Sequence, residues 1–356
     1  MKTPLFYKSK PTFGIDIGHG VVKVVQLEKN IKSNDKLIGY GYYSFSPAAI
    51  DEHGVITDIE AVAKATYQLI QTHMVGSIMT NRIAATIPSA RTFTRILKLP
   101  PINDDDLEKA VRAEAEQYIP VPIADLYIDY ELTKHGEKEN EVLMVATPRP
   151  VIDSYLQVFK ALGLEVAAIE PSLTAVTRAI SQSQTVDESV MVVDFGSLSS
   201  DLSIFDGSNV RVTGTARQGG DDLTDQLVKK LGITKRQAFH GKVRYGIKQD
   251  TKQGREIYTH AKPILENLVT EIKKLVRYYK RLDDSGDISA ILLLGGGANL
   301  PGLDDFISKQ TGMKVVLSNP WSKIDVGDLQ APNPVETALY TTAVGSALLE
   351  SDQEGK

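Results

Sequence analysis

The chain has 356 residues, 42% of them hydrophobic and 24% charged, a balance typical of a globular protein long enough for two domains. Its net charge of −5 argues against a dedicated nucleic-acid binder, which would show a basic surface. The absence of cysteine excludes disulfides and thiolate metal ligands, and no apolar run approaches the roughly 18–20 residues of a membrane span. Residues 1–11 lack the apolar core and cleavage site of a secretory signal, so we expect a cytoplasmic protein.

Short strands and helices alternate through the first half of the chain. Apolar and β-branched runs predict strands over 12–16, 21–27, 37–45, 83–88, 126–133, 141–147 and 166–169. Apolar residues at helical spacing predict helices over 59–73, 104–118, 151–162 and 173–181. Asn103 is placed to cap the second of these helices, and prolines at 120 and 122 stop it because proline cannot continue a helix.

The pattern restarts after a polar segment, residues 181–189, which is the best candidate for an interdomain linker. Strands are predicted over 190–194, 202–206 and 209–215, the last two forming a hairpin through Gly207 and Ser208. Helices fill much of 221–282, a buried strand covers 288–294, and a final helix spans 335–349. The chain therefore reads as two related halves.

A short unit with an acidic residue at a strand end occurs once in each half. Asp16-Ile17-Gly18 and Asp194-Phe195-Gly196 both end a strand and precede a hairpin. One such unit alone is ordinarily only a tight turn. Two copies in a duplicated chain predict facing hairpins whose backbone N–H groups clamp phosphates, while Asp16 and Asp194 hold Mg²⁺ through water.

Three consecutive glycines follow the strand predicted at 288–294. Gly295, Gly296 and Gly297 are interpreted either as a tight strand-to-helix turn or as a place where the backbone closely approaches an adenosine. The sequence has no Gly-x4-Gly-Lys-Ser/Thr pattern, which excludes a P-loop.

The order of these three motifs, 16–23, 194–201 and 295–301, resembles the actin, sugar-kinase and chaperone ATPase superfamily. The resemblance implies an α/β fold of the actin-like, ribonuclease H-like duplicated type, with two domains that bind ATP and Mg²⁺. It also implies that the nucleotide is contacted from the three motifs by Gly18, His19, Gly20, Lys23, Gly196, Ser197, Ser199, Gly295, Gly296, Gly297 and Asn299.

Two further turns resemble elements of the same superfamily. The run Ile169 to Ala175 is similar to the Glu-Pro-x-x-Ala turn of MreB and the large heat-shock chaperones, which implies that Glu170 orders the attacking water. The alternative is an acid favoured by the dipole at a helix N-terminus. The run Gln218 to Asp221 resembles a Gly-Gly-Asp/Glu turn beside the nucleotide, which adds Gly219 and Gly220 to the site.

The sequence departs from the superfamily pattern at two places. MreB and FtsA carry Ala-Glu-x-x-Lys on a helix that meets the ribose and adenine; here Lys242 is present but Phe239 replaces the glutamate. This loss is expected to lower nucleotide affinity or relax base choice. In the first hairpin, His19-Gly20-Val21 replaces a serine-rich turn, so a hydroxyl contact is lost while the backbone cradle is kept.

The segment between the first domain's strands and Glu170 resembles the insert subdomain of the PilM family of type IV pilus assembly proteins. Residues 114–122, 126–132, 142–148 and 159–170 carry this likeness, and 14–27, 292–303, 318–321 and 340–345 extend it over nearly the whole chain. The resemblance implies domain I over 1–82 and 164–187, an FtsA/PilM-type insert over 83–163, domain II over 188–334, and a C-terminal helix, 335–356, returning to domain I.

Membership of this family implies a cytoplasmic ATP-binding scaffold that is recruited to the inner membrane by its partner. The partner is the N-terminal cytoplasmic peptide of PilN, held in a groove between the insert and domain I for which Arg91, Phe93 and Tyr118 are candidates. ATP hydrolysis is expected to be weak or partner-dependent. Contacts with pilus motor ATPases and a homo-oligomer are left open by the sequence.

Two alternatives share the fold. An FtsA-like division protein would carry a long tail ending in an amphipathic membrane helix, whereas residues 351–356 have no apolar face. A small-molecule kinase would need a substrate base and larger insertions, for which the sequence offers no candidate.

Overall fold

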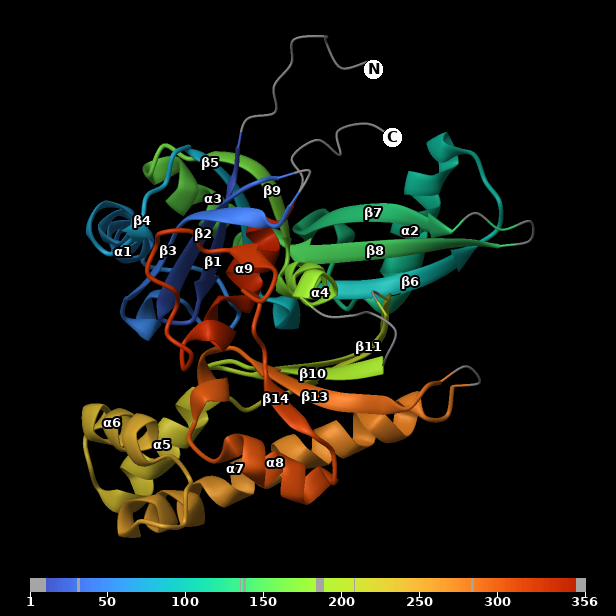
Figure 1. Cartoon of the computed structure of the whole chain (residues 1–356). Helices are drawn as coiled ribbons and strands as arrows, with labels where there is room; N and C mark the ends of the chain where they lie inside the picture. Colours follow the sequence, from blue (N-terminus) through green and yellow to red (C-terminus); the bar gives the residue numbers. More distant parts are fainter. Residues whose placement is uncertain are drawn as a thin grey trace.

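The computed structural model describes residues 11–30, 33–134, 136, 139–183, 189–207, 209–282 and 285–349, which form two domains and an insert (Figure 1). Residues 1–10, most of the predicted linker (184–188), Ser208 of the predicted hairpin turn and the tail 350–356 lie outside the described residues. In the described part, no helix combines the length and apolar character required to cross a membrane.

Domain I is built on a mixed sheet whose central strand, β1 (Phe13–Gly18), ends at the first acidic motif. β1 pairs antiparallel with β2 and parallel with β5, so it lies between the antiparallel strands and the parallel strands of the sheet. The sheet order is β15 (Ile324–Asp325), β3 (Asp35–Ser44), β2 (Val21–Glu28), β1, β5 (Arg82–Ile87) and β9 (Glu165–Pro171), with β4 (Val75–Gly76) paired to β3.

Domain II repeats this arrangement. Its central strand β10 pairs antiparallel with β11 and parallel with β13, as β1 does with β2 and β5. Both sheets therefore consist of an antiparallel meander followed by parallel strands, which confirms the predicted duplication. The order is β12 (Asn209–Ala216), β11 (Ser200–Asp206), β10 (Ser189–Phe195), β13 (Ile288–Leu294) and β14 (Val315–Leu317).

Two helices cover the outer face of the domain I sheet. α1 (Ile59–Thr72) begins at Asp58, whose carboxylate accepts a hydrogen bond from the Ala61 N–H, 2.9 Å. α3 (Arg149–Ala161) packs beside it and buries Tyr155 and Phe159 completely. These apolar faces and the strands β1 and β5 form one core, so α3 is part of domain I.

Two helices lie between the two sheets, α4 (Ser172–Ser183) and α9 (Thr341–Ala347) (Figure 1). Their backbones approach so closely that a Cβ on Gly345 would lie 1.8 Å from the Ala175 carbonyl oxygen, so a side chain cannot be accommodated there.

The final helix predicted over 335–349 is wrong in length. Asn333 turns the chain by accepting hydrogen bonds from the N–H groups of residues 335 and 336, and a 3-10 turn over 337–340 precedes α9.

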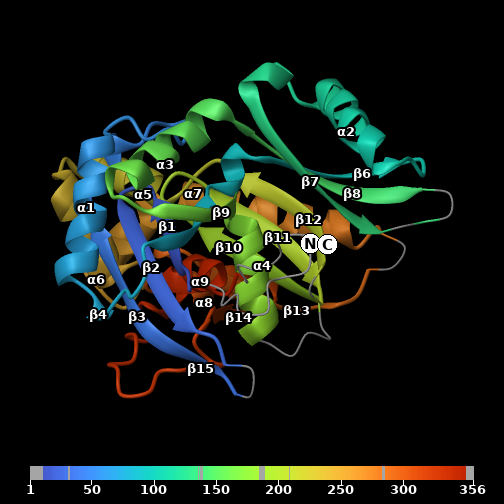
Figure 2. The same cartoon turned by 90° about the horizontal axis from the view of Figure 1, so that it is seen from above.

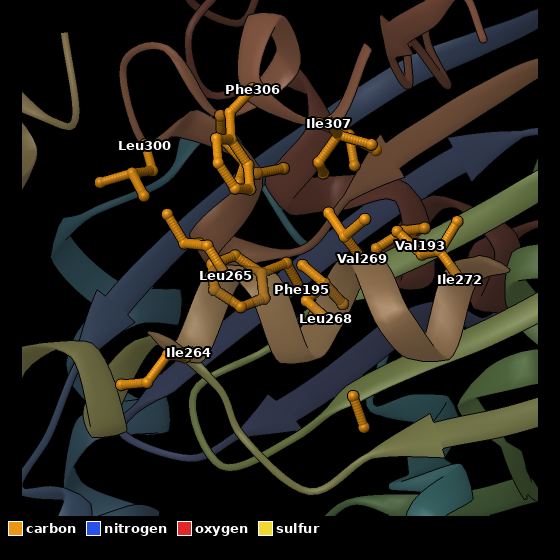
Figure 3. Close-up of a cluster of buried hydrophobic side chains, with 14 of the residues drawn as sticks. Val193, Phe195, Ile264, Leu265, Leu268, Val269, Ile272, Leu300, Phe306 and Ile307 are labelled. Atoms are coloured by element: carbon orange, nitrogen blue, oxygen red, sulfur yellow. The ribbon is translucent and has the colours of Figure 1, made fainter. Parts of the chain in front are cut away.

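Domain II places its longest helix, α7 (Lys252–Tyr279), against the sheet (Figure 3). Leu265, Leu268 and Ile272 follow one face of α7 at helical spacing and meet Val193 and Phe195 of β10. The remaining helices of this domain are α5 (Gly220–Leu231), α6 (Lys235–Tyr245) and α8 (Leu303–Thr311).

The insert is a separate small sheet with one helix, α2 (Asp104–Tyr118), on its outer face (Figure 2). Asn103 stands at the N-cap of α2, but its side chain makes no capping hydrogen bond. Most of β5 and all of α3 fall within the predicted insert range 83–163, but they belong to the sheet and core of domain I, so the separate insert sheet begins only at β6. Its strands, in sheet order, are β6 (Phe93–Leu99), β8 (Asn140–Pro148) and β7 (Leu126–Lys134).

Short 3-10 turns connect several of these elements in the described ranges. They are η1 (Pro47–Ala49), η2 (Ser89–Arg91), η3 (Ile123–Asp125), η4 (Gly296–Asn299) and η5 (Thr337–Tyr340).

Candidate functional site

A cleft between the two domains brings the strand-end motifs together. Because β1 and β10 occupy equivalent places in the duplicated fold, their carboxyl ends open onto this cleft from opposite sides. The glycine turn that follows β13 completes the lining beside β10. The predicted residues that line the cleft are Asp16, Gly18, His19, Lys23, Asp194, Gly196, Ser197, Ser199, Gly295 and Gly296.

Other predicted residues lie around the cleft but do not line it. Glu170 is at the end of β9, where the Arg178 guanidinium binds its carboxylate. The remaining ones are Gly20, Gly219, Gly220, Lys242, Gly297 and Asn299.

Arg91 and Asp201 both line the cleft, although sequence reasoning named Arg91 only as a candidate for the peptide groove and assigned no role to Asp201. Asp201 stands directly opposite Asp194 in the β10–β11 ladder, so the hairpin register would have identified it. Arg91 follows β5 in η2, a turn with no sequence motif.

Asp16 is held by side chains of its own domain. Lys23 lies opposite Asp16 in the β1–β2 ladder and donates a hydrogen bond to one carboxylate oxygen. Thr86, opposite Asp16 in the β1–β5 ladder, donates to the other oxygen at 2.9 Å. The negative charge of Asp16 is therefore compensated within domain I.

Asp194 has a different environment, although it occupies the equivalent position in domain II. Its ladder partners are Asp201 on β11 and Leu294 on β13, where Asp16 has a lysine and a threonine. Burial, followed by repulsion from the Asp201 carboxylate, raises the pKa of Asp194 to about 7. This side of the cleft therefore carries acidic groups that a cation would stabilise.

Asp201 also has a raised pKa, because burial disfavours its charged form. Three groups oppose that effect: the Thr215 hydroxyl, which donates at 3.1 Å, the charge of Arg91, and the Ala90 N–H, which donates a hydrogen bond. Arg91 and Ala90 belong to domain I, so Asp201 contacts both domains.

The glycines around the cleft fall into two groups. A Cβ on Gly295 would lie 2.2 Å from an Asp194 carboxylate oxygen, and one on Gly219 would lie 2.3 Å from the Ser197 carbonyl oxygen, so these glycines let turns pack together. A Cβ on Gly18 or Gly296 would meet nothing closer than 3.6 Å or 3.8 Å and would project into the cleft. The cleft is thus lined by bare backbone that a ligand can approach closely.

His19 contacts the opposite domain. Its Nδ1 lies 3.1 Å from the Asp221 carboxylate at the start of α5, and its Nε2 lies 3.2 Å from the Ile50 carbonyl oxygen. Both partners only accept hydrogen bonds, so both contacts are made together when each ring nitrogen carries a proton. His19, which lies in the turn that is serine-rich elsewhere in the superfamily, therefore links domains I and II beside the cleft.

Lys242 supports the turn at the start of α5. Its ammonium donates to the Gly220 carbonyl oxygen at 2.7 Å and to the Thr224 hydroxyl at 2.9 Å, and burial lowers its pKa. The Gly220 N–H in turn donates to the Gly196 carbonyl oxygen at 2.8 Å. Phe239 is exposed, with its ring centroid 5.6 Å from the Lys242 nitrogen. Lys242 is thus linked to the second acidic motif through backbone.

The candidates for a peptide groove do not share one surface. Arg91 lines the cleft, and Phe93 packs against the core of the insert. Tyr118 is exposed at the end of α2, where the Arg95 guanidinium lies 3.6 Å from its ring centroid. An exposed aromatic and cationic pair therefore marks the insert, away from the cleft.

The comparisons with known proteins agree with this architecture. Residues 14–351 match the family model described as type IV pilus assembly protein PilM. The cell division protein FtsA of Streptococcus pneumoniae serotype 2 (strain D39 / NCTC 7466) is 22% identical over 351 residues, covering 86% of this chain and 75% of FtsA.

Solved structures show the same fold. The PilM–PilN type IV pilus biogenesis complex matches with a TM-score of 0.81 and 21% identity, over 95% of this chain and 98% of that one. The ethanolamine utilization protein EutJ of Carboxydothermus hydrogenoformans gives 0.55 and 16%, over 96% and 90%. MreB5 of Spiroplasma citri bound to AMPPNP gives 0.54 and 13%, over 95% of each chain. The predicted actin-like fold is confirmed.

Proposed function

The chain belongs to the type IV pilus assembly protein PilM family, and we propose that it is an ATP-binding scaffold of a type IV pilus machine. The observation that supports ATP binding is the cleft itself, where the two duplicated strand-end motifs and the glycine turn after β13 converge. MreB5, a protein of the same fold, has been solved with AMPPNP.

The lining residues fit a nucleotide with its metal. At Gly18 and Gly296 phosphate oxygens can approach the backbone without a side chain in the way. Asp194 and Asp201 supply the oxygen ligands that Mg²⁺ prefers. Mg²⁺, when bound, neutralises phosphate charge. In the described residues no three acidic or histidine side chains gather as a metal site, so phosphate or water oxygens would complete its ligands.

A steric test distinguishes a nucleotide-binding cleft from a gap between the domains that binds no ligand. Gly18→Val and Gly296→Val fill the cleft, while neither glycine has a positive φ or a close neighbour that a Cβ would displace. Isothermal titration with Mg·ATP should show at least about tenfold weaker binding in both variants, with melting temperatures close to wild type. Gly241→Ala, on α6 outside the cleft, is the control. Unchanged affinity in both valine variants would refute a nucleotide site in this cleft.

We further propose that the insert holds the N-terminal cytoplasmic peptide of PilN, which brings the protein to the inner membrane. The solved relative with the same fold is a complex with PilN. The insert sheet has β6 and β7 as its edge strands, and an extended peptide binds an edge by strand pairing and side-chain pockets. The exposed Tyr118 and Arg95 pair supplies an anchor of the kind that peptide interfaces favour.

Titration with a synthetic peptide of the cognate PilN N-terminus, and with its scrambled sequence, tests the partner. Tyr118→Ala should weaken binding of the native peptide about tenfold or more, as loss of an aromatic anchor does. Tyr67→Ala is the matched control, since Tyr67 is also exposed but lies on α1 in domain I. Equal affinity for native and scrambled peptides would refute the partner, and equal effects of the two tyrosine variants would move the site away from α2.

An FtsA-like division role remains the second candidate, since FtsA is a relative of this chain. The two roles differ at the membrane. Flotation with protein-free anionic liposomes should leave the protein unbound if recruitment depends on PilN. Clear co-flotation without a partner would favour the FtsA-like role.

A further inference from the structure

A short segment, residues 89–94, connects the nucleotide cleft to the insert. It leaves the end of β5, passes through η2 and becomes β6, the first strand of the insert. Arg91 lines the cleft described above, whereas Ser89, Thr92 and Thr94 line a second cavity between β6, α4 and the domain II sheet. Ala90 lines both. We call residues 89–94 the connector.

The connector is held firmly by hydrogen bonds. Within it, the Thr92 N–H and hydroxyl both donate to the Ser89 carbonyl oxygen, at 3.0 Å and 2.9 Å. Toward α4, the Ser89 hydroxyl lies 2.9 Å from the Ser172 hydroxyl and accepts from the Leu173 N–H at 2.7 Å. A segment bonded at this density moves as a unit, so a displacement of Arg91 is passed on to Thr92 and β6.

Arg91 is an uncommitted cation in the cleft. Lys23, the other lysine or arginine in the lining, is bound to Asp16. The Arg91 guanidinium has no hydrogen-bond or salt-bridge partner among the described residues, and its charge acts on Asp201 across the cleft. Its stem packs on Gly54, where an added Cβ would lie 3.0 Å from the Arg91 Cγ. The side chain is therefore positioned by domain I, with its charged end available to a ligand.

Arg91 lies beside the acidic side of the cleft. Asp194 and Asp201 are the carboxylates proposed to hold the metal, and the outer phosphates of a nucleotide are the ones that share such a metal. A guanidinium binds phosphate oxygens in a paired, planar geometry that a lysine ammonium cannot reproduce.

We propose that Arg91 binds the terminal phosphate of ATP and that the connector carries this contact to the insert, so that the bound nucleotide sets the affinity for the partner peptide. This inference rests on the proposed function. Binding couplings are reciprocal, so the peptide changes ATP affinity by the same factor as ATP changes peptide affinity.

The first test measures Mg·ATP and Mg·ADP affinities of the full chain by titration calorimetry. Wild type should prefer ATP. Arg91→Ala should reduce that preference about tenfold or more while leaving ADP affinity within about threefold, because only the terminal phosphate loses its partner. Arg91→Lys should recover part of the preference. Arg277→Ala, an exposed arginine on α7 outside the cleft, should behave as wild type.

The outcomes distinguish a failure of this inference from a failure of the proposed ATP-binding function. Absence of ATP binding in wild type would overturn the proposed function and this inference together. A wild type without ATP preference, or an Arg91→Ala variant that keeps the preference with a wild-type melting temperature, would overturn the role of Arg91 alone.

The second test measures the coupling. ATP affinity is compared with and without a saturating synthetic peptide of the PilN N-terminus, in wild type and in Arg91→Ala. Wild type should show a severalfold difference, in the range of ordinary allosteric couplings, and Arg91→Ala should show none. The same difference in both proteins would show that the coupling bypasses Arg91.

Discussion

Arg178 holds Glu170 through two parallel hydrogen bonds, with Nη1–Oε1 at 2.8 Å and Nη2–Oε2 at 2.7 Å. The same Nη1 donates to the Gly345 carbonyl oxygen at 2.7 Å. Glu170 lies near the end of β9, Arg178 on α4 and Gly345 on α9, so this pair connects the domain I sheet to the helices between the domains. Arg178 thus binds both carboxylate oxygens of Glu170 away from the cleft lining, and the water-ordering role implied by the superfamily resemblance stays a prediction.

Removing one member of this pair should destabilise the protein. Both side chains are largely buried, so Glu170→Ala leaves a guanidinium without its carboxylate and should cost about 2–3 kcal/mol of unfolding free energy. Urea denaturation of Glu170→Ala, Arg178→Ala and the double variant should give a double variant less destabilised than the sum. Wild-type stability in Glu170→Ala, with ATP bound but turned over more slowly, would contradict this structural role and support the water-ordering one.

The raised pKa of Asp194 predicts a pH dependence of stability. In the folded protein this carboxyl keeps its proton up to about pH 7, whereas its ordinary value is 3.8. Between these values the folded state binds more protons than the unfolded state, so stability falls as pH rises through this window and then levels off.

Asp194→Asn removes the ionisable group and should abolish that decline. Without nucleotide and metal, the variant should be more stable than wild type at about pH 8, by on the order of 1–3 kcal/mol. The gain is limited because the side chain faces an open cleft, where solvent screens its charge. At about pH 4 the variant and wild type should have similar stability. Urea denaturation across this range measures the difference. Asp305→Asn, an exposed carboxylate on α8, serves as control. A stability gain independent of pH would contradict the assigned titration.

The contact between His19 and Asp221 should couple the two domains energetically. The pair is partly buried, with 16% and 26% of the side chains exposed, and it is charge-assisted when the imidazole carries both protons. A double-mutant cycle with His19→Ala and Asp221→Asn should give a coupling of about 1 kcal/mol in unfolding free energy. A coupling indistinguishable from zero would mean that the contact does not hold the domains together.

The sequence predicted the repeated architecture because strand ends and hairpins are local signals. Asp16 and Asp194 could be matched from a three-residue unit, and the register of their hairpins places both at the cleft. The features that the sequence could not predict depend on contacts with residues far away along the chain. Arg91 has no local motif, and β6 was not predicted because the polar residues Thr94, Arg95 and Lys98 interrupt the apolar pattern of a strand. Glu170 lies in a recognisable turn, but its role depends on where Arg178 and α9 pack.

The insert should be removable without unfolding the two domains. Its buried residues form their own cluster, and Phe93 and Ala146 are partners in the β6–β8 ladder, so their Cα atoms lie about 5 Å apart. Replacing 93–146 by a short Gly-Ser link between Thr92 and Thr147 therefore reconnects neighbouring ends. We expect a cooperative thermal transition and retained Mg·ATP binding, with loss of PilN-peptide binding in titration calorimetry.

Deleting the wider range 83–163 is the matched comparison. It removes β5 from between β1 and β9 and takes away Tyr155 and Phe159, which are fully buried in the core of domain I. Loss of two such aromatic side chains alone is expected to cost several kcal/mol, comparable with the whole stability of a domain, so this deletion should not fold. A 93–146 deletion that folds and still binds the PilN peptide would place the partner site on domain I or II, whereas a 93–146 deletion that fails to fold would show that the insert is an integral part of the domain I core.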